Sequence, residues 1–290
     1  MAAFSIAGAG AIGASIATLL HRAGVEVEFL GRDGDEPTRE VKVVLPSGER
    51  VEWTCPNRTP GSELQTVARL VVATKAAAVA DVLAVWRGQR TYFLQNGRGF
   101  VPEGIRGYSI VNTGLSASRH DGVVHLSSQE PMWIGSDTLP EPSDDLVVLA
   151  SAGIKVRWCD DLERRQWEKV AINAIINPMT VLAGTTNGAT FESAAARSRA
   201  AAILGEIATL FEAMHVELSL EALTDSFERV LAVTQSNTSS MLQDFNRGNA
   251  NSELPFITGA LERAAEPLGV AMVETQRLAR ETEARFGALA

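Results

Sequence analysis

The chain has 290 residues, of which 46% are hydrophobic, and this is enough apolar material for one large or two medium domains with buried cores. Lys and Arg number 26 and Asp and Glu number 35, so the net charge is −9 at pH 7. A mildly acidic chain has no general attraction for phosphate backbones or anionic lipid, so nucleic acid and membranes are excluded as expected partners.

Cysteine use and the N-terminal segment bear on the compartment. The two cysteines, Cys55 and Cys159, show neither zinc spacing nor a disulfide framework, and the four histidines show no metal spacing. The segment before Phe4 has no basic region or cleavage site, and no run of about 18 apolar residues occurs. We therefore expect a cytoplasmic protein with reduced thiols, no transmembrane segment and no metal.

In the first half of the chain, short apolar runs alternate with a helical stretch. A small-residue helix is expected over Ala11–Ala23, and Asp33–Pro60 looks irregular. Val123–Ile134 has no helical period and predicts an antiparallel extension of the sheet. The other expected strands are Phe4–Ala7, Val25–Leu30, Leu70–Ala73, Thr91–Leu94, Tyr108–Asn112 and Lys155–Trp158. Strands interleaved with helices indicate βαβ units and a parallel sheet.

The second half is rich in Ala, Glu, Arg and Leu at helical spacing, with long helices expected over Ala194–His215, Leu220–Leu242 and Leu254–Leu268. We place the boundary near Asp160, after the last strand. The predicted fold class is therefore α/β: an N-terminal Rossmann domain with a mostly parallel sheet over residues 1–160, followed by an all-α C-terminal domain over residues 161–290.

A glycine motif opens the chain, with Gly8, Gly10 and Gly13 in the pattern G-x-G-x-x-G. The first glycine permits a tight turn, the second lets the backbone approach a pyrophosphate, and the third lets helix and strand pack closely. The helix then offers free N–H groups to phosphates. Small residues also mark plain helix–strand packing, but the strand before and the helix after favour a dinucleotide site. The expected contacts are Gly8, Ala9, Gly10, Ala11, Ile12 and Gly13.

The end of the second expected strand bears on the choice of cofactor. NAD enzymes usually carry an acidic residue there for the ribose hydroxyls, whereas this chain has Arg32. A guanidinium suits a ribose 2′-phosphate, so we favour NADP(H). A solvated arginine beside Asp33 is the alternative. Lys75 follows another expected strand, where ligands collect in open α/β sheets, although a bare lysine there is often only a surface residue.

Lys169, Asn173 and Asn177 are spaced four residues apart in a helix that is otherwise mostly apolar. They form one polar stripe on a largely buried helix, and buried polar groups need partners. Partial burial lowers the pKa of a lysine, which suits a general acid for carbonyl reduction. The alternative is that Lys169 extends from a core helix to water and that the asparagines cap loops. Pro178 is expected to end the regular pattern.

Over nearly its whole length the chain resembles the ketopantoate reductase (2-dehydropantoate 2-reductase) family. The lysine–asparagine helix and the Ser-Ser-Met-Leu-Gln-Asp segment are the specific features, whereas the glycine motif is shared with many dehydrogenases. The residues that carry the resemblance are the glycine motif with Arg32, Thr74-Lys75, Gln95-Asn96-Gly97, Trp167 to Pro178, Asn237 to Asp244, and Ser252-Glu253.

The resemblance implies an N-terminal domain that binds NADPH, a helical domain that closes over it, and hydride transfer to the keto carbon of ketopantoate to give pantoate for pantothenate synthesis. It implies Lys169 as the catalytic proton donor and Glu253 as the acid that holds the substrate hydroxyl. The remaining roles are substrate binding by Asn173, Asn177 and the carboxylate ligand Ser240, contact with both the substrate and the nicotinamide for Asn96, and 2′-phosphate binding by Arg32.

Two positions depart from the family pattern: Pro255 stands where a polar residue is common, and Thr258 where an asparagine is common. Because both alter the segment that presents Glu253, the substrate stays open, and another branched 2-keto acid on the same scaffold is an alternative. Two further alternatives are a related β-hydroxyacid-type dehydrogenase and a non-catalytic NADP-sensing protein. A sensor would need only the glycine loop and Arg32, so the presence of Lys169 with both asparagines argues against it. A homodimer through the helical domain is also left open.

Overall fold

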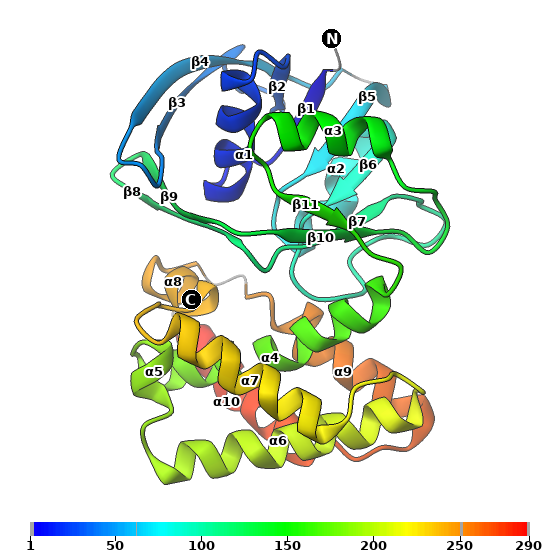
Figure 1. Cartoon of the computed structure of the whole chain (residues 1–290), viewed down its shortest axis with the longest axis vertical. Coiled ribbons are helices and arrows are strands. Elements are labelled where there is room, and N and C mark those ends of the chain that lie inside the picture. The colour runs from blue at the N-terminus through cyan, green and yellow to red at the C-terminus, as the bar shows by residue number, and fades with distance from the viewer. Residues whose placement is uncertain (1–2, 62, 250–251, 289–290) are drawn as a thin grey trace. The chain divides into compact units, whose positions relative to one another are not determined.

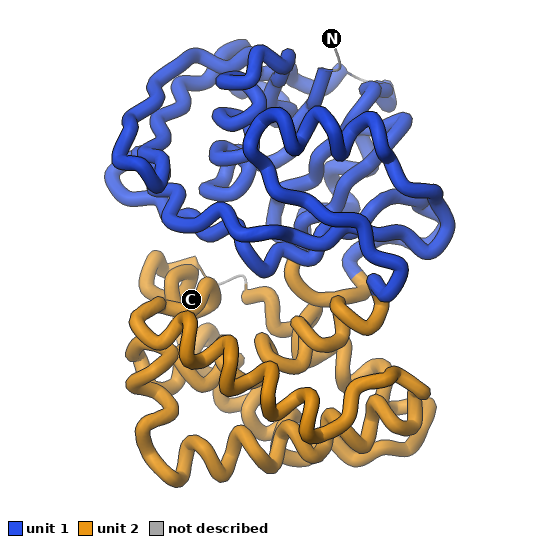
Figure 2. The backbone as a smooth tube through the Cα atoms, in the orientation of Figure 1, with its two compact units in different colours: residues 1–95, 100–162 blue, residues 96–99, 163–290 orange. Residues whose placement is uncertain are grey.

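The computed structural model describes residues 3–61, 63–249 and 252–288. Their contacts divide the chain into two compact units: residues 1–95 with 100–162, and residues 96–99 with 163–290 (Figure 2). The short segment 96–99 therefore belongs to the second unit although the first unit surrounds it in sequence.

The first unit is built on one sheet, which has eleven strands among the described residues, in the order β11-β10-β7-β6-β5-β1-β2-β4-β3-β9-β8 (Figure 1). Most pairings are parallel, including all those from β4 through β2, β1, β5 and β6 to β7. The strands are β1 (Phe4–Ala7), β2 (Val27–Leu30), β3 (Thr38–Val44), β4 (Arg50–Arg58), β5 (Gln65–Val72), β6 (Trp86–Phe93), β7 (Tyr108–Val111), β8 (Leu115–His120), β9 (Val123–Gln129), β10 (Met132–Gly135) and β11 (Val156–Trp158).

The helices of this unit are α1 (Ala11–Arg22), the 3₁₀ turn η1 (Ala76–Ala78), α2 (Val79–Val85) and α3 (Ser143–Ser151). All four residues of β1 are buried, as expected for a parallel strand covered on both faces. The predicted class, a mostly parallel α/β sheet followed by a helical region, is confirmed. The expected antiparallel extension also forms, since β9 pairs antiparallel with β8 and β10 with β7.

The segment Asp33–Pro60 is not irregular, as the sequence suggested, but contains the antiparallel hairpin β3–β4. Its alternation is real: Val41 and Val43 are buried while Glu40 is exposed. Gly48, with φ +84, closes the turn, and its N–H donates to the carbonyl of Leu45 at 2.8 Å. Because many residues on the outward face are charged, the alternation of buried and exposed residues in this segment is not evident from its composition.

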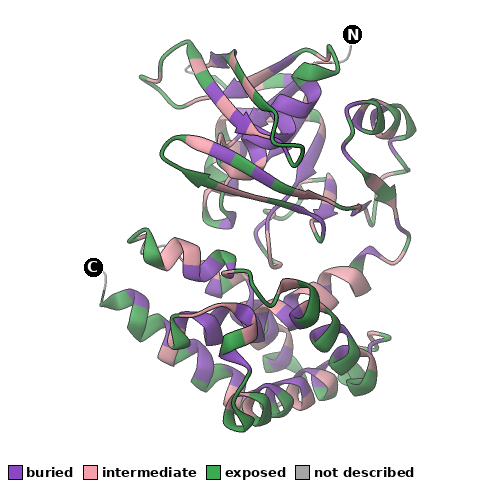
Figure 3. Ribbon diagram, turned by 60° about the vertical axis from the view of Figure 1, so that its left-hand side comes forward, coloured by how far each residue is buried: buried purple, intermediate pink, exposed green. Residues whose placement is uncertain are grey.

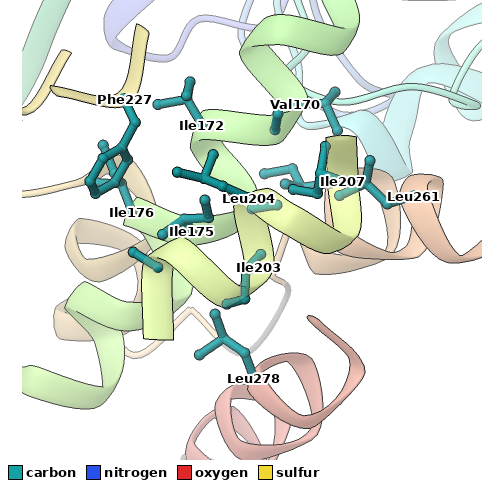
Figure 4. Packing of buried hydrophobic residues seen from close by; sticks show 14 of the residues in the cluster. Val170, Ile172, Ile175, Ile176, Ile203, Leu204, Ile207, Phe227, Leu261 and Leu278 are labelled. Atoms are coloured by element: carbon teal, nitrogen blue, oxygen red, sulfur yellow. The ribbon is translucent and has the colours of Figure 1, made fainter. Parts of the chain in front are cut away.

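The second unit is helical. Its elements are α4 (Leu162–Ala183), which starts one residue before the unit does, then α5 (Asn187–Thr190), α6 (Ala194–Ala213), α7 (Leu220–Thr234), α8 (Ser240–Asn246), η2 (Leu254–Phe256), α9 (Thr258–Ala265), η3 (Glu266–Leu268) and α10 (Val273–Gly287). Buried residues lie on the inward sides of these helices (Figure 3). Ile172 and Ile176 of α4 pack near Phe227 of α7, and Leu278 of α10 points towards Ile203 of α6 (Figure 4).

Three expectations for the helices were wrong. The helix predicted over Leu220–Leu242 breaks into α7 and α8 because Ser239 caps a new start, its hydroxyl accepting the N–H of Leu242 at 3.1 Å. The helix over Leu254–Leu268 breaks at Ile257, whose φ of −105 and ψ of −84 are not helical. Pro178 does not end α4, which runs to Ala183, because almost every residue beside it is buried and this packing offsets the missing N–H.

Two glycines of the motif are required by geometry. Gly8 has φ +107, and a Cβ on it would lie 2.6 Å from the backbone carbon of Ala73. A Cβ on Gly13 would lie 1.9 Å from the carbonyl oxygen of Gly8, so α1 could not pack against the loop that follows β1. Gly10 differs, because its φ is −69 and a Cβ would meet nothing within 4 Å. The fold therefore has room for a side chain at position 10.

We predict that Gly13→Ala destabilises the chain by about 1–3 kcal/mol or more, because the added methyl overlaps backbone that cannot move without displacing α1. Gly10→Ala is the matched control, and we expect it to lower stability by less than about 1 kcal/mol, because its methyl meets nothing within 4 Å and only the weaker N-cap preference of alanine remains. Urea unfolding followed by circular dichroism measures both. Equal stability of the two variants would contradict this account of the motif.

Candidate functional site

A cavity of about 690 Å³ lies within the first unit, at the carboxyl ends of β1 and β2. The chain passes from β1 to β2 on one side and later returns to β5 on the other side of β1, so the strand order reverses at β1. Ligands of open α/β sheets bind at such a switch point. The lining residues include Gly8, Ala9, Leu30, Gly31, Arg32, Asp33, Asp35, Arg39, Asn57, Thr74, Val82, Val85 and Trp86.

Two polar atoms in the wall of this cavity are unsatisfied. Asn57 Oδ1 and Thr74 Oγ1 are buried and have no hydrogen-bond partner among the described residues. Asn57 Nδ2 is already used, since it donates to the carbonyl of Glu36 at 2.7 Å. A buried polar atom without a partner costs free energy, so a ligand with hydroxyl groups would complete the site. Ribose hydroxyls and the apolar surface of Val82, Val85 and Trp86 fit the adenosine half of a dinucleotide.

The structure places the predicted cofactor residues as follows. Gly8, Ala9 and Arg32 line the cavity. Gly10 is the exposed N-cap of α1, Ala11 and Ile12 are half-buried in its first turn, and Gly13 is buried beneath the loop. Lys75 is exposed and follows the lining residue Thr74. Asn96 belongs to the other unit.

Sequence reasoning missed several groups at this cavity. Asp35, Arg39 and Asn57 come from the hairpin region that looked irregular, so no motif marked them. Arg119 of β8 was also missed: its Nη2 donates to the carbonyl oxygen of Ala9 in the glycine loop at 2.7 Å. The two residues are 110 positions apart, so only the tertiary structure reveals the contact.

The second unit holds the lysine. Lys169 is half-buried on α4, one turn before Asn173 and two turns before the buried Asn177. Burial lowers the pKa of Lys169 from 10.5 to about 8, while the nearby negative charge of Glu253 acts in the opposite direction. Glu253 lies immediately before η2, far from Lys169 in sequence. The fold therefore brings together the two residues predicted to be catalytic.

Asn96 joins the same cluster, with its Nδ2 donating to Glu253 Oε2 at 3.3 Å. The segment that carries Asn96 is fixed by its neighbours. Gly97 has φ +89 and lies so close to η2 that a Cβ would fall 2.0 Å from the carbonyl oxygen of Phe256. The N–H of Arg98 donates to the same oxygen at 2.8 Å.

The side chain of Arg98 anchors this segment to α4. Its guanidinium donates to Gln166 Oε1 at 2.9 Å and to Glu163 Oε1 at 3.3 Å. It also lies over the ring of Trp167, 4.5 Å from the centroid. Sequence reasoning singled out Trp167 but missed Arg98, because a single arginine beside a Gly-rich turn resembles a surface residue.

Ser240 is exposed as the first residue of α8, and its neighbour Ser239 is buried. Ser239 Oγ lies 2.6 Å from Thr180 Oγ1, and the Thr180 hydroxyl donates to the carbonyl of Asn177 at 2.8 Å. The pair of hydroxyls connects the end of the polar stripe on α4 to the start of α8. Neither Thr180 nor Ser239 was predicted, since each looks like an ordinary helix residue in the sequence.

The cluster can do acid–base chemistry on a small anionic ligand. An ammonium whose pKa is about 8 is mostly protonated at neutral pH yet gives up its proton readily. The amide of Asn173, one turn away on the same helix, can donate to a carbonyl oxygen on which negative charge develops, and the amide of Asn177, a further turn along, can donate to another polar group of the ligand. The carboxylate of Glu253 can accept from a hydroxyl of a ligand.

Two family models match the chain. "Ketopantoate reductase PanE/ApbA" matches residues 4–138 and "Ketopantoate reductase PanE/ApbA C terminal" matches residues 161–285. The chain is 28% identical over 284 residues to a 2-dehydropantoate 2-reductase of Yersinia pestis, covering 94% of this chain and 92% of that protein.

Two solved structures share the fold. A dimeric ketopantoate reductase from Staphylococcus aureus superposes with a TM-score of 0.84 at 16% identity, covering 99% of this chain and 100% of the other. A D-mandelate dehydrogenase, solved with NADH and anilino(oxo)acetate, superposes with a TM-score of 0.83 at 20% identity and 99% coverage of both chains.

We predict that Glu253→Gln lowers the pKa of Lys169 below about 8, because it removes the negative charge that opposes the effect of burial. A pH titration of Lys169 by NMR with isotope-labelled lysine measures the pKa. Glu168→Gln is the control: it removes a carboxylate beside Lys169 in sequence whose side chain instead accepts from Ser226. A pKa of Lys169 that stays at about 8 in Glu253→Gln would contradict the proposed pairing.

We also predict that Lys169→Met stabilises the unliganded chain at neutral pH. Because the folded state lowers the pKa of Lys169, the unfolded chain binds more protons between about pH 8 and 10.5, and stability rises with pH through that window. Below it the buried ammonium costs about 1–3 kcal/mol. Urea unfolding at pH 7 and near pH 10 measures the change, and a Lys169→Met variant that is less stable at pH 7 than the wild type would be inconsistent with this penalty.

Proposed function

Since the chain belongs to the ketopantoate reductase family and is an oxidoreductase, we propose that it is a 2-dehydropantoate 2-reductase that reduces ketopantoate to pantoate with NADPH. The observation that carries the proposal is the half-buried Lys169, with its pKa lowered to about 8, beside Glu253 and its partner Asn96. A carbonyl reductase needs such an acid at the oxygen of its substrate.

Lys169 donates the proton. When bound, the reduced nicotinamide supplies the hydride that adds to the keto carbon. The ammonium of Lys169 polarises the keto oxygen and protonates the alkoxide that forms. Because its pKa is close to neutral, the proton is both present before the step and transferable during it.

The other residues of the cluster orient the substrate. Asn173 and Asn177 donate hydrogen bonds along α4, and Ser240 at the start of α8 receives the substrate carboxylate. Glu253 accepts the substrate hydroxyl, and Asn96 holds the carboxylate of Glu253 in one orientation through its bond of 3.3 Å. A site that bonds a hydroxyl rejects analogues that lack it, because its own acceptor is then left unpaired.

The cofactor binds at the cavity of the first unit. Support comes from the glycine loop, the two unsatisfied atoms of Asn57 and Thr74, and the placement of Arg32 in the cavity wall. We propose NADPH rather than NADH because the guanidinium of Arg32 can form charge-assisted bonds with a 2′-phosphate. Lys75 adds a second positive charge at the carboxyl end of β5.

A second candidate, reduction of another branched 2-keto acid, is favoured by one observation. Thr258, where the family commonly has an asparagine, is buried and donates its hydroxyl to the carbonyl of Leu254 at 3.1 Å. Pro255 is likewise unable to supply a polar side chain next to Glu253. The chain therefore lacks two polar groups near the residue that reads the substrate hydroxyl, and a substrate without that hydroxyl would need fewer of them.

We predict that the purified protein oxidises NADPH with ketopantoate, with a kcat/KM at least about 10²-fold higher than with 2-ketoisovalerate, which lacks the hydroxyl. Loss of NADPH absorbance measures both rates. Lys169→Met should abolish turnover while NADPH binding, followed by fluorescence titration, is retained, because Lys169 is not among the residues that line the cavity proposed for the cofactor. Turnover of 2-ketoisovalerate at the rate of ketopantoate would favour the second candidate, and binding of NADPH without turnover of either acid would indicate a sensor.

A further inference from the structure

The 2′-phosphate end of the cofactor cavity contains a negative charge from the chain itself. Asp35 Oδ2 accepts the backbone N–H of Arg32 at 2.9 Å, and the same oxygen lies 3.5 Å from Nη2 of Arg39. A Cβ on Gly31 would lie 3.0 Å from this oxygen, so it sits against the backbone at the end of β2. Arg32, Asp35 and Arg39 all line the cavity.

The hairpin β3–β4 brings Arg39 to this place. Arg39 pairs with Cys55 of β4, and β4 runs parallel to β2, next to which the cavity opens. Asn57, two residues beyond Cys55, is 4% exposed and also lines the cavity. Its Oδ1 has no hydrogen-bond partner among the described residues, so the cavity wall contains an unsatisfied acceptor close to Gly31 and Asp35.

The donors that Asp35 uses are those that a phosphate monoester would use. Backbone N–H groups and guanidinium groups are the usual ligands of phosphate oxygens. Here one carboxylate oxygen already accepts from the first and pairs with the second. A carboxylate and a phosphate at the same donors repel each other, so both cannot hold that position at once. Asp33 also lines the cavity, but Asp35 is the carboxylate with these contacts to Arg32 and Arg39.

We propose that Asp35 is an internal counter-ion of the 2′-phosphate subsite, that Arg39 is the second cation of this subsite, and that the phosphate of NADPH must displace the Asp35 carboxylate to bind. This inference rests on the proposed use of NADPH. NADH carries a neutral 2′-hydroxyl, which can donate to the carboxylate of Asp35 without displacing it. Arg32 and Arg39 raise the affinity for NADPH relative to NADH, and Asp35 reduces this difference in affinity.

The test is the dissociation constant of NADPH and of NADH, measured by fluorescence titration without substrate. Asp35→Asn keeps an oxygen that can accept from Arg32 but removes the charge, so we expect NADPH to bind at least about fivefold more tightly relative to NADH. Asp33→Asn, which neutralises a cavity residue two positions away, is the matched control and should change this ratio less than about twofold. Titration with 2′-AMP against 5′-AMP should show the same difference.

Arg39 is tested in the same way. Arg39→Ala should weaken NADPH at least about fivefold while NADH changes less than about twofold. Lys42→Ala removes a positive charge from the same strand at a position that does not line the cavity, and should leave both constants unchanged.

An unchanged or weaker affinity of Asp35→Asn for NADPH would overturn the role of Asp35, as would an equal gain in Asp33→Asn. Equal losses for NADPH and NADH in Arg39→Ala would overturn the role of Arg39. Failure of the proposed function would give a different result: wild-type protein that binds nucleotide but does not reduce ketopantoate. Even then, the ratio of the dissociation constants of NADPH and NADH in the variants would still test the roles of Asp35 and Arg39.

Discussion

The burial of one lysine ammonium on an otherwise apolar helix is the interaction on which the candidate site depends. From Val170 to Val181 almost every residue of α4 is buried, so Lys169 stands where water is partly excluded and its charged form is penalised. The negative charge of Glu253 offsets part of this penalty, and the pKa of Lys169 is about 8. The opposing effects of burial and charge therefore keep this lysine near neutral pH, which is what a proton donor requires.

The segment from Asn96 to Arg98 connects Glu253 to α4. Asn96 bonds Glu253, Gly97 packs against the backbone of Phe256, and Arg98 ties the segment to Gln166 and Trp167 of α4. The segment 96–99 is thus part of the helical unit, although it begins only three residues after the end of the sheet strand β6. The bond from Asn96 orients the Glu253 carboxylate, and the contacts of Gly97 and Arg98 hold the segment that carries Asn96.

Much of this architecture could be predicted from the sequence, because it is encoded locally. The glycine motif, the apolar run of β1 and the polar stripe on α4 each follow from periodicity and sterics within a dozen residues. The hairpin β3–β4 could not be found, since its charged outward face hides the alternation. The broken helices at Ser239 and Ile257 were missed because capping and backbone geometry depend on tertiary neighbours. Arg98 and Arg119 act through partners that only folding brings near. Asp35 contacts Arg32 and Arg39, which are close in sequence, but their place in the wall of the cavity follows from the tertiary structure.

The two units carry complementary chemistry. The first has the glycine loop and a cavity with unsatisfied polar atoms, and the second has the acid–base cluster. The most direct test of the central claim is the pH dependence of kcat/KM for ketopantoate at saturating NADPH, since kcat/KM reports the ionisation of groups before the substrate binds. With Lys169 as the proposed proton donor, kcat/KM should be level at lower pH and fall about tenfold per pH unit above about pH 8. A kcat/KM that stays constant from about pH 6 to pH 10 would contradict the proposed role of Lys169 as proton donor.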